Sequence, residues 1–544
     1  MTVLGLSPFG SRDVSWLLES KAREHSERQW LVWRDADGDR LEWTYGEFFE
    51  GVCKVAAGLA ELGVAEGSRV VLFTENCPDY LFVWFATMRI GAVMVSVNAR
   101  YKTAEVTNVL RRVGPVVVVT SSALLPVVAA ALDGVKAEAT GGRVLQYARL
   151  ELLIADVAMK APYGAGELAR GLTSLLRAPS GPDSRVGSSP AGLLAPAGIQ
   201  FTSGTTAQPK AVVWTQANYM WGGKVSASHE DLHADDRHFV HLPLFHTNAQ
   251  IYSVMASLWV GGAIILVPRF SASRFWQIAV EEGATWCSMV PFAVKALRGS
   301  AVPAHSIRRF GNSVIVPSWD RYFRVSTVAW WGMTETVTHP IVSDPSDEAH
   351  PLAMGTPACE YQVRVLGEDG LPVCHGSGML EVRGIQGVSL ALGYLDDPVA
   401  TAATWGAGGW MRTGDRVEVH EDGWLSFLER EGDTLKVGGE NVAALEVERV
   451  IGTVRGVREV AVVGAPDAML DEIPIAFVLV DSALGAEDRL AVRQQIDLAC
   501  QSELSSFKVP REVYVVDEFP RVTLDKVAKA ELRKLARTLR GECD

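Results

Sequence analysis

Short runs of apolar residues alternate with longer amphipathic stretches in the first part of the chain. The runs at 69–73, 92–97 and 116–120 are bounded by polar residues or glycine, and they predict buried strands. Between the first two runs, residues 79–89 predict a helix, with Pro78 near its start. The order strand, helix, strand favours a parallel sheet.

The pattern weakens over residues 121–199, which are rich in Ala, Gly, Ser and Pro, and the segment 176–192 predicts a loop. Beyond this region the signals sharpen again. Residues 239–244 predict a strand, residues 325–335 predict a strand that runs into a loop, and residues 423–431 predict another β segment.

The character of the chain changes again near residues 430–436. Strand-like segments then alternate with helical stretches, the strands at 458–467, 474–480 and 511–519 and the helices at 486–503 and 527–540. A small α+β domain of about 110 residues is an ordinary size for an independent unit. We therefore expect two domains, 1–431 and 432–544.

The longest uncharged run, residues 251–267, is shorter than the roughly 20 apolar residues that a spanning helix needs. It contains Gly261-Gly262, and it predicts a buried helix, a turn and a strand. The N-terminal residues lack the basic and apolar regions of a signal peptide. The sequence therefore predicts no membrane span.

Composition narrows the class of protein. Of the 544 residues, 48% are hydrophobic and 21% are charged, which is typical of a globular protein and not of a disordered one. The net charge of −13 argues against nucleic acid as a partner, because phosphate contacts need clustered cations. The 7 cysteines include no CxxC pair, which disfavours a disulfide framework or a zinc site and favours a cytoplasmic location.

The stretch FTSGTTAQPK, residues 201–210, gathers hydroxyl side chains around one glycine and ends on a lysine. It is not a Walker A loop, since no GK[ST] follows the glycine. The same physics still applies, because glycine lets the backbone approach a phosphate while hydroxyls and a lysine bind its oxygens. A solvated Ser/Thr turn is the alternative. The candidate anion-binding residues are Thr202, Ser203, Gly204, Thr205, Thr206 and Lys210.

Later segments continue the series in a recognisable order. They are TSGTTAQPKA at 202–211, WGMTE at 331–335, WMRTGD at 410–415, EREGDTLKVGGENV at 429–442 and PRVTLDKVAKAEL at 520–532. Together they resemble the motifs of the adenylate-forming superfamily of acyl-CoA synthetases, adenylation enzymes and luciferases. The resemblance implies an α/β fold with a large N-terminal domain of parallel-rich sheets, helices and a β-barrel-like part, and a small mobile C-terminal domain.

The resemblance also implies an ATP-dependent acid–CoA ligase. A carboxylic acid and ATP would give an acyl-adenylate and pyrophosphate, and CoA would then give the thioester and AMP. Because two anions meet in the first step, positive charge is needed there, and Lys526 would supply it. Thr334 would donate to the α-phosphate, and Glu335 would hold Mg²⁺, which prefers carboxylate and phosphate oxygens.

Four further residues would bind the nucleotide. Trp331 and Gly332 would flank the adenine. Asp415 would accept hydrogen bonds from both ribose hydroxyls, as an acceptor-only carboxylate can. Arg430 would contact ribose or phosphate near the joint between the domains.

The second step implies a rotation of the C-terminal domain. Asp433 would be the hinge, so that one site presents different faces of the small domain to the two reactions. Lys436, Gly438 and Gly439 would then border CoA, because two glycines allow close approach of its pantetheine chain.

The acyl pocket is expected around His246 in PLFH, where the imidazole would sit near the carboxylate, together with Asn248, Asn312 and Met333. Further members of the expected set are Gln250, Met289, Val290, Trp330 and His339. This mixture of polar and bulky residues favours a small or medium, functionalised acid over a long fatty acid. The region around FHTNAQ resembles the carnitine/crotonobetaine-CoA ligase branch.

Each of these residues also has a structural interpretation. Lys526 could be a solvated lysine, Trp331 a core residue, His246 a satisfied structural histidine, and KVGG an ordinary turn. The sequence also departs from the family at Ala207, Ala211 and Asp525, where glycine is usual.

Three hypotheses therefore stay open. They are an acid–CoA ligase, an adenylating enzyme that loads a carrier protein or oxidises its adenylate, and a nucleotide-binding homologue without catalysis. The sequence identifies neither the acid nor the pathway. A homodimer is compatible with it, and the oligomeric state is left open.

Overall fold

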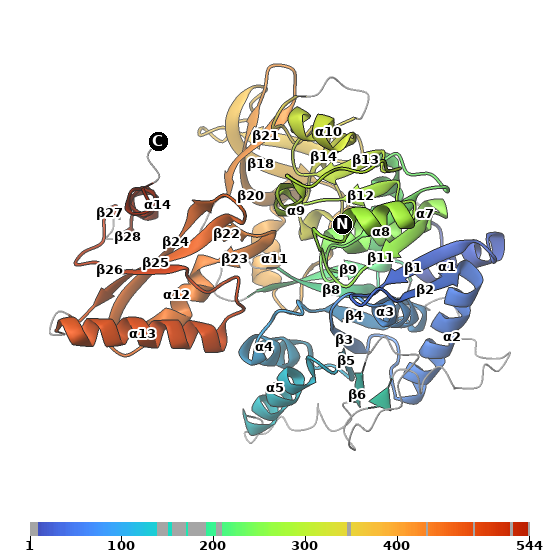
Figure 1. Cartoon of the computed structure of the whole chain (residues 1–544), viewed down its shortest axis with the longest axis horizontal. Coiled ribbons are helices and arrows are strands. Elements are labelled where there is room, and N and C mark those ends of the chain that lie inside the picture. Colours follow the sequence, from blue (N-terminus) through green and yellow to red (C-terminus); the bar gives the residue numbers. More distant parts are fainter. Residues whose placement is uncertain are drawn as a thin grey trace.

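The computed structural model describes residues 9–138, 151–154, 170–171, 192–202, 209–344, 350–430, 434–481, 485–522 and 526–541 (Figure 1). The predicted loop at 176–192 falls almost entirely outside the described residues. So do Ser203 to Thr206 of the predicted phosphate loop, the predicted hinge Asp433, and Ala207 and Asp525.

One mixed sheet contains the strands expected near the start of the chain. Its order is β19-β9-β8-β4-β3-β5-β6-β7, and the strands from β8 to β7 are parallel. The runs of apolar residues are confirmed as strands because they are buried on both faces. The bounds are β3 (Arg69–Phe73), β4 (Val93–Ser96), β5 (Val117–Thr120), β6 (Glu151–Ile154), β7 (Arg170–Gly171), β8 (Pro196–Thr202), β9 (Lys210–Thr215) and β19 (Gly393–Tyr394).

A second mixed sheet has the order β16-β15-β14-β13-β12-β10-β11-β1-β2, parallel from β14 to β1. The strand predicted at 325–335 is confirmed as β14, and the run at 251–267 forms helix, turn and strand as expected. The bounds are β1 (Gln29–Arg34), β2 (Arg40–Thr44), β10 (Arg237–Val240), β11 (Ala263–Leu266), β12 (Trp286–Ser288), β13 (Arg309–Asn312), β14 (Ser326–Trp331), β15 (Ile341–Val342) and β16 (Thr356–Pro357).

Helices fill the space between these two sheets and cover their outer faces (Figure 1). The inner layer shares one core with both sheets and contains α1 (Val14–Glu24), α2 (Tyr45–Glu61), α3 (Pro78–Ile90), α6 (Gln216–His229), the π-helix η4 (Asn248–Met255) and α7 (Ala256–Val260). The outer helices are α4 (Thr103–Val113) and α5 (Leu125–Glu138) on the first sheet, and α8 (Phe275–Glu281), α9 (Pro291–Leu297) and α10 (Pro317–Phe323) on the second. Parallel sheets buried in this way present the carboxyl ends of their strands at one edge.

A third, antiparallel sheet has the order β17-β18-β20-β21 and corresponds to the expected β-barrel-like part. Its core includes Trp331 from the end of β14, so this sheet packs beside the carboxyl edge of the second sheet. The bounds are β17 (Gln362–Leu366), β18 (Gly376–Arg383), β20 (Trp410–Val419) and β21 (Leu425–Arg430), with η5 (Thr334–Thr336), α11 (Pro398–Thr404) and η6 (Ala407–Gly409) nearby.

Residues from 434 onward form a sheet and two hydrophobic clusters of their own. The predicted strands and the helix at 486–503 are confirmed, because an apolar face of each element is buried in these clusters. The bounds are β22 (Thr434–Val437), β23 (Glu440–Ala443), α12 (Ala444–Gly452), β24 (Val457–Asp467), β25 (Asp471–Val480), α13 (Ala486–Glu503), β26 (Glu512–Val515), β27 (Arg521–Val522), β28 (Lys526–Val527) and α14 (Lys529–Leu539). The division between 431 and 432 falls among residues 431–433, outside the described residues, and it stays a prediction.

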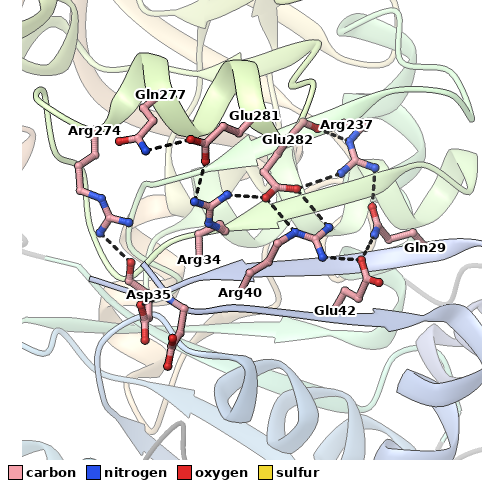
Figure 2. Close-up of polar contacts among 11 residues, drawn as sticks. Gln29, Arg34, Asp35, Arg40, Glu42, Arg237, Arg274, Gln277, Glu281 and Glu282 are labelled. Atoms are coloured by element: carbon pink, nitrogen blue, oxygen red, sulfur yellow. Dashed lines mark hydrogen bonds and ion pairs between the residues drawn. The ribbon is translucent and has the colours of Figure 1, made fainter. Parts of the chain in front are cut away.

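A buried carboxylate ties the edge hairpin β1–β2 to the end of α8 (Figure 2). Glu282 accepts from Arg34 Nη1 at 2.7 Å and from Arg40 Nε at 3.0 Å, and Arg237 Nη2 lies 3.7 Å away. The Glu282 side chain is 4% exposed. Burial alone would raise the pKa of this carboxyl, but the hydrogen bonds from Arg40 and Arg34 hold it below its usual range.

We expect Glu282→Gln to lower the free energy of unfolding by about 1–3 kcal/mol at neutral pH, because the buried Arg34 then keeps only the exposed Glu281 as an anionic partner. A carboxyl whose folded pKa is lowered stabilises the fold above its unfolded pKa, and the gain is lost as pH falls through the folded pKa. The difference between wild type and variant should therefore shrink between about pH 5 and pH 3 in urea unfolding. Glu50→Gln, which removes an exposed pair with Lys54, is the control and should change stability by less than about 1 kcal/mol.

Candidate active site

A cavity of about 810 Å³ lies where β8, β12, β13 and β14 end, at the carboxyl edges of the two parallel sheets. The antiparallel sheet contributes the β20 segment 412–415 to its wall, and the hairpin β22–β23 of the C-terminal part closes another side. A cavity at such an edge is the usual ligand site of open α/β sheets. Segments of the two large sheets, the antiparallel sheet and the C-terminal part therefore meet at one cavity.

Trp331 and Asp415 form one wall of the cavity. The indole Nε1 of Trp331 donates to Asp415 Oδ2 at 2.8 Å, and the two residues are 7% and 3% exposed. Gly332 continues the wall. Arg430 pairs with Asp415 through the backbone of β20 and β21, so the predicted nucleotide residues meet here. A buried carboxylate beside an indole and a glycine can accept hydrogen bonds from a ribose while a flat base packs alongside.

The ends of the β8–β9 hairpin reach the cavity from another side. Thr202 pairs with Lys210 in the hairpin register, and both residues line the cavity. Lys210 Nζ lies over the ring of Tyr394 at 4.7 Å. Ala211, where glycine was expected from the resemblance, is a buried strand residue opposite Phe201 and needs no positive φ.

Glu335 is a buried oxygen ligand at the same wall. It is 4% exposed, and its Oε1 accepts a hydrogen bond from the Tyr394 hydroxyl at 2.8 Å. Its neighbour Thr334 lines the cavity and is fixed by Trp214 Nε1, which donates to the Thr334 carbonyl at 2.9 Å. A carboxylate presented in this way has the hard oxygen chemistry that Mg²⁺ prefers, so the residues present fit that ion.

The expected acyl pocket is reproduced in part. His246, Asn248 and Met333 line the cavity, but the structure does not place Asn312 among its lining residues. The Asn312 side chain accepts from the backbone of Ser313 at 2.9 Å, and Ser313 reaches the cavity instead.

Two further members of the expected set lie behind the wall. Gln250 is buried in a network with Gln200 and Ser96, and His339 is buried behind Trp330. Both are held by the core, and neither is among the lining residues of the cavity.

The C-terminal hairpin brings part of the predicted CoA segment to the cavity. Lys436 and Gly439 line it, and Lys436 Nζ lies over the ring of Phe427 at 4.5 Å. Gly438 and Gly439 turn the hairpin with φ of 58° and 87°, a backbone region that favours glycine. A Cβ on Gly439 would lie 3.8 Å from Val290 of the cavity wall.

Lys526 lies elsewhere. Its backbone belongs to the small hairpin β27–β28, paired with Val522. Figure 1 shows this hairpin on the outer side of the C-terminal sheet, away from the large part of the molecule. The structure thus brings Lys436 and Gly439 to the site and leaves Lys526 outside it.

Buried charges hold the C-terminal part in this position. Glu440, next to the turn glycines, accepts from His246 Nε2 at 3.1 Å and from Asn98 Nδ2 at 3.3 Å, with Arg100 Nη1 3.7 Å away. Burial alone would raise the pKa of the Glu440 carboxyl, but the charges of His246 and Arg100 hold it below its usual range.

A second buried cluster centres on Lys508, which is 2% exposed. Its ammonium pairs with Glu446 of the same part at 2.8 Å and with Glu105 of α4 in the large part. Ser505 Oγ donates to Glu105 Oε2 at 2.7 Å. Burial alone would lower the pKa of Lys508, but Tyr101, Glu105 and Glu446 raise it above its usual range, so the lysine stays charged.

Sequence reasoning missed three residues that organise this site. Tyr394 and Lys508 lie in no segment of clear chemical pattern, and Glu440 lies within the motif 429–442 without an assigned role. Each acts through a partner distant in sequence. For Glu440, the usable signal in the sequence was a charged residue directly after two glycines and close to apolar residues.

The layered α/β part, the cavity at its carboxyl edge and the small domain over it define the class of adenylate-forming enzymes. The chain belongs to the AMP-binding enzyme family, whose family model matches residues 18–395. The model of the AMP-binding enzyme C-terminal domain matches residues 446–526. The resemblance seen in the motifs is therefore confirmed.

Relatives extend over nearly the whole chain. The crotonobetaine/carnitine–CoA ligases of Proteus mirabilis and Shigella flexneri are each 28% identical over 536 residues, covering 96% of this chain and 99% of theirs. A fatty acyl CoA synthetase of Mycobacterium tuberculosis is 27% identical with a TM-score of 0.66, covering 97% of this chain and 99% of that one.

Two more distant structures share the fold. The o-succinylbenzoate CoA synthetase of Bacillus subtilis has a TM-score of 0.77 at 22% identity, covering 95% of this chain and 98% of that one. A benzoate CoA ligase of Burkholderia xenovorans LB400 has a TM-score of 0.68 at 23% identity, covering 96% and 100%. In the described part of the chain, none of the helices combines the length and the hydropathy that a membrane span requires.

We expect Glu105→Gln to loosen the docking of the C-terminal part, because a buried lysine then keeps one carboxylate instead of two. Amide exchange should become about tenfold faster or more in α4 and around Lys508, while the cores of the two parts keep their protection. Glu531→Gln removes an exposed pair with Lys534 and is the matched control. Unchanged exchange in α4 would show that the cluster does not hold the two parts together.

Proposed function

We propose that the protein is an AMP-forming acid–CoA ligase. A carboxylic acid displaces pyrophosphate from ATP to give an acyl-adenylate, and the CoA thiol displaces AMP from it to give the thioester and a proton. The observation that carries the proposal is the position of the β22–β23 hairpin, whose Lys436 and Gly439 face the same cavity as Asp415, Glu335 and His246. The relatives are named as CoA ligases, which supports this acceptor.

In the first half-reaction, Asp415 binds the ribose, Trp331 and Gly332 border the adenine, and Arg430 contacts ribose or phosphate. The loop from Thr202 to Lys210, through Ser203, Gly204, Thr205 and Thr206, receives the triphosphate. Thr334 donates to the α-phosphate. A Mg²⁺ ion held by Glu335 would offset the negative charge of the phosphates when bound.

Lys526 brings the remaining positive charge between carboxylate and α-phosphate. Because its hairpin lies outside the cavity in this structure, the C-terminal domain must rotate to deliver it. We place the hinge at Asp433, between the domains 1–431 and 432–544.

The described arrangement suits the second half-reaction. The turn at Gly438 and Gly439 leaves room for a pantetheine chain to pass beside Val290, since no Cβ projects there. Glu440 holds the imidazole of His246 toward the C-terminal hairpin, so the ring is turned by the same contact that docks the domain. Domain docking and the opening of the thiol path are thereby one event. Because ATP and CoA are intracellular, we propose a cytoplasmic enzyme.

The direct test is carboxylate-dependent pyrophosphate release over a panel of acids, with and without CoA. The proposal expects release that depends on the acid, rises on turnover with CoA, and yields AMP and an acyl-CoA. Adenylate formation without transfer to CoA would favour a carrier-protein acceptor. ATP binding without release for every acid would contradict catalysis.

We expect Lys526→Ala to lower adenylate formation about 10²-fold to 10³-fold, because one preorganised charge in the transition state is lost. Thioester formation from an acyl-adenylate supplied in trans should stay close to wild type. Isotope exchange between pyrophosphate and ATP measures the first step, and acyl-CoA release measures the second. Equal losses in both steps would contradict the assignment of Lys526 to the first.

We expect Gly439→Ala to do the opposite, slowing thioester formation while exchange of pyrophosphate into ATP is unchanged. The new Cβ faces Val290 in the thiol path, and φ of 87° strains any other residue. Gly423→Ala is the matched control, because Gly423 has φ of 86° with open space around it and lies in a surface turn. If both variants slow thioester formation equally, backbone strain alone explains the loss, and the CoA thiol does not pass beside Gly439.

A further inference from the structure

The inner end of the cavity is closed by the ring of Trp330. This ring is 6% exposed and lies between two others: Trp286 at a centroid distance of 5.9 Å and an angle of 6°, and His339 at 4.5 Å and 19°. Burial lowers the pKa of His339 well below its ordinary range, so the ring behind Trp330 is neutral. Trp330 is therefore clamped in place as a rigid wall.

Gly311 makes room for this wall. A Cβ on Gly311 would lie 1.7 Å from Cη2 of Trp330 and 2.5 Å from Cη2 of Trp286, distances that no side chain can occupy. The indole thus occupies the space above β13 that a smaller residue at position 330 would leave open. The pair Gly311 and Trp330 sets the depth of the pocket.

A phenol on the π-helix η4 also faces the cavity. Asn248 and Tyr252 lie one turn apart on this helix, and both line the cavity. Among the described residues, the Tyr252 hydroxyl has no hydrogen-bond partner, whereas the Oδ1 atom of Asn248 is sealed from the cavity by its neighbours. Burial raises the pKa of Tyr252, so its phenol stays protonated.

Gly332 keeps the Tyr252 hydroxyl at the cavity. A Cβ on Gly332 would lie 2.8 Å from Tyr252 Oη and 2.7 Å from the Thr338 carbonyl, so any larger residue would displace the phenol. Tyr252 also meets the edge of Trp330 at 5.6 Å and 70°. A phenol without a partner beside an indole wall favours a ligand that forms a hydrogen bond with it.

We propose that Trp330, seated on Gly311, limits the acid to a short chain, and that the Tyr252 hydroxyl selects a hydrogen-bonding substituent on it, a hydroxyl or an ammonium. The inference rests on the proposed function for the place of the acyl group. In this proposal, Trp330 sets the length of the acyl group, and Tyr252 forms a hydrogen bond with its polar substituent.

The test measures binding without turnover. Sulfamoyl analogues of acyl-adenylates carrying butanoyl, γ-hydroxybutanoyl, γ-aminobutanoyl, decanoyl and benzoyl groups are titrated by calorimetry into the full-length enzyme. We expect a γ-substituted analogue to bind about tenfold tighter or more than decanoyl and benzoyl, and about threefold to tenfold tighter than butanoyl. Equal or tighter binding of decanoyl or benzoyl to wild type would overturn the inference.

Two variants assign the effect to residues. Trp330→Ala should improve binding of the decanoyl analogue by about tenfold or more, because the space over Gly311 opens. Tyr252→Phe should remove the preference for the γ-substituent over plain butanoyl and leave butanoyl binding as in wild type. Should Trp330→Ala fail to fold, Trp330→Phe opens the same space in part, and the wild-type series stands by itself.

Trp276→Ala is the matched control. Trp276 is 7% exposed and packs on His305 and Phe323 in the outer core, so its removal costs similar packing without touching the pocket. Its acyl preference should equal that of wild type, and a changed preference would attribute the Trp330 effect to general destabilisation. Tight analogue binding without pyrophosphate release in turnover would contradict the ligase function while leaving the pocket assignment intact.

Discussion

The site depends on buried charge between the two parts of the molecule. Lys508 and Glu440 belong to the small C-terminal part, and each is buried against a partner from the large part, Glu105 for Lys508 and His246 for Glu440. A buried charge is tolerated when it is paired and costly when it is not. These contacts therefore favour the described position of the small part over positions in which the same charges would be buried without a partner.

This constraint explains why one cavity can serve two chemistries. The residues proposed for nucleotide and acid come from the large part, whereas the small part carries the Lys436–Gly439 turn at the cavity and the hairpin of Lys526 on its outer side. The proposed rotation would require the buried pairs between the two parts to separate and take up water together. The large part is by contrast fixed throughout, since aromatic side chains link its two parallel sheets through shared inner helices.

At Trp330, the packing of the core and the proposed selection of the acid depend on the same side chain. Trp330 is a core residue by burial and a wall residue by position, and Gly311 is the condition for both. The π-helix beside it places Asn248 and Tyr252 on one side, as such helices often do at functional sites. The Tyr252 hydroxyl has no hydrogen-bond partner in the described part of the chain, so it can form a hydrogen bond with a ligand in the cavity.

Local pattern was sufficient for the elements and the motifs. Uninterrupted apolar runs predicted β3, β4 and β5, and the succession of strand-like and helical segments predicted the strands and α13 of the C-terminal part. Burial on one or two faces of an element shows in the spacing of apolar residues that are neighbours in the sequence. The helix α5 was not predicted, because the periodicity of its segment is weak. The helix within residues 251–267 was predicted, but the π-helical hydrogen-bond register of η4 leaves no mark in the local pattern.

By itself, the sequence determined the family and the order of the elements, and it predicted the residues Trp331, Gly332 and Asp415 that form one wall of the cavity, because these follow from short contiguous segments. Only the tertiary structure decided that Ser313 and not Asn312 faces the cavity, that Tyr394 holds Glu335, and that the turn after Lys436, rather than the hairpin that carries Lys526, stands at the site. Each of these depends on contacts between segments far apart in the chain. Such contacts are settled by which buried groups find partners, and no local pattern records them.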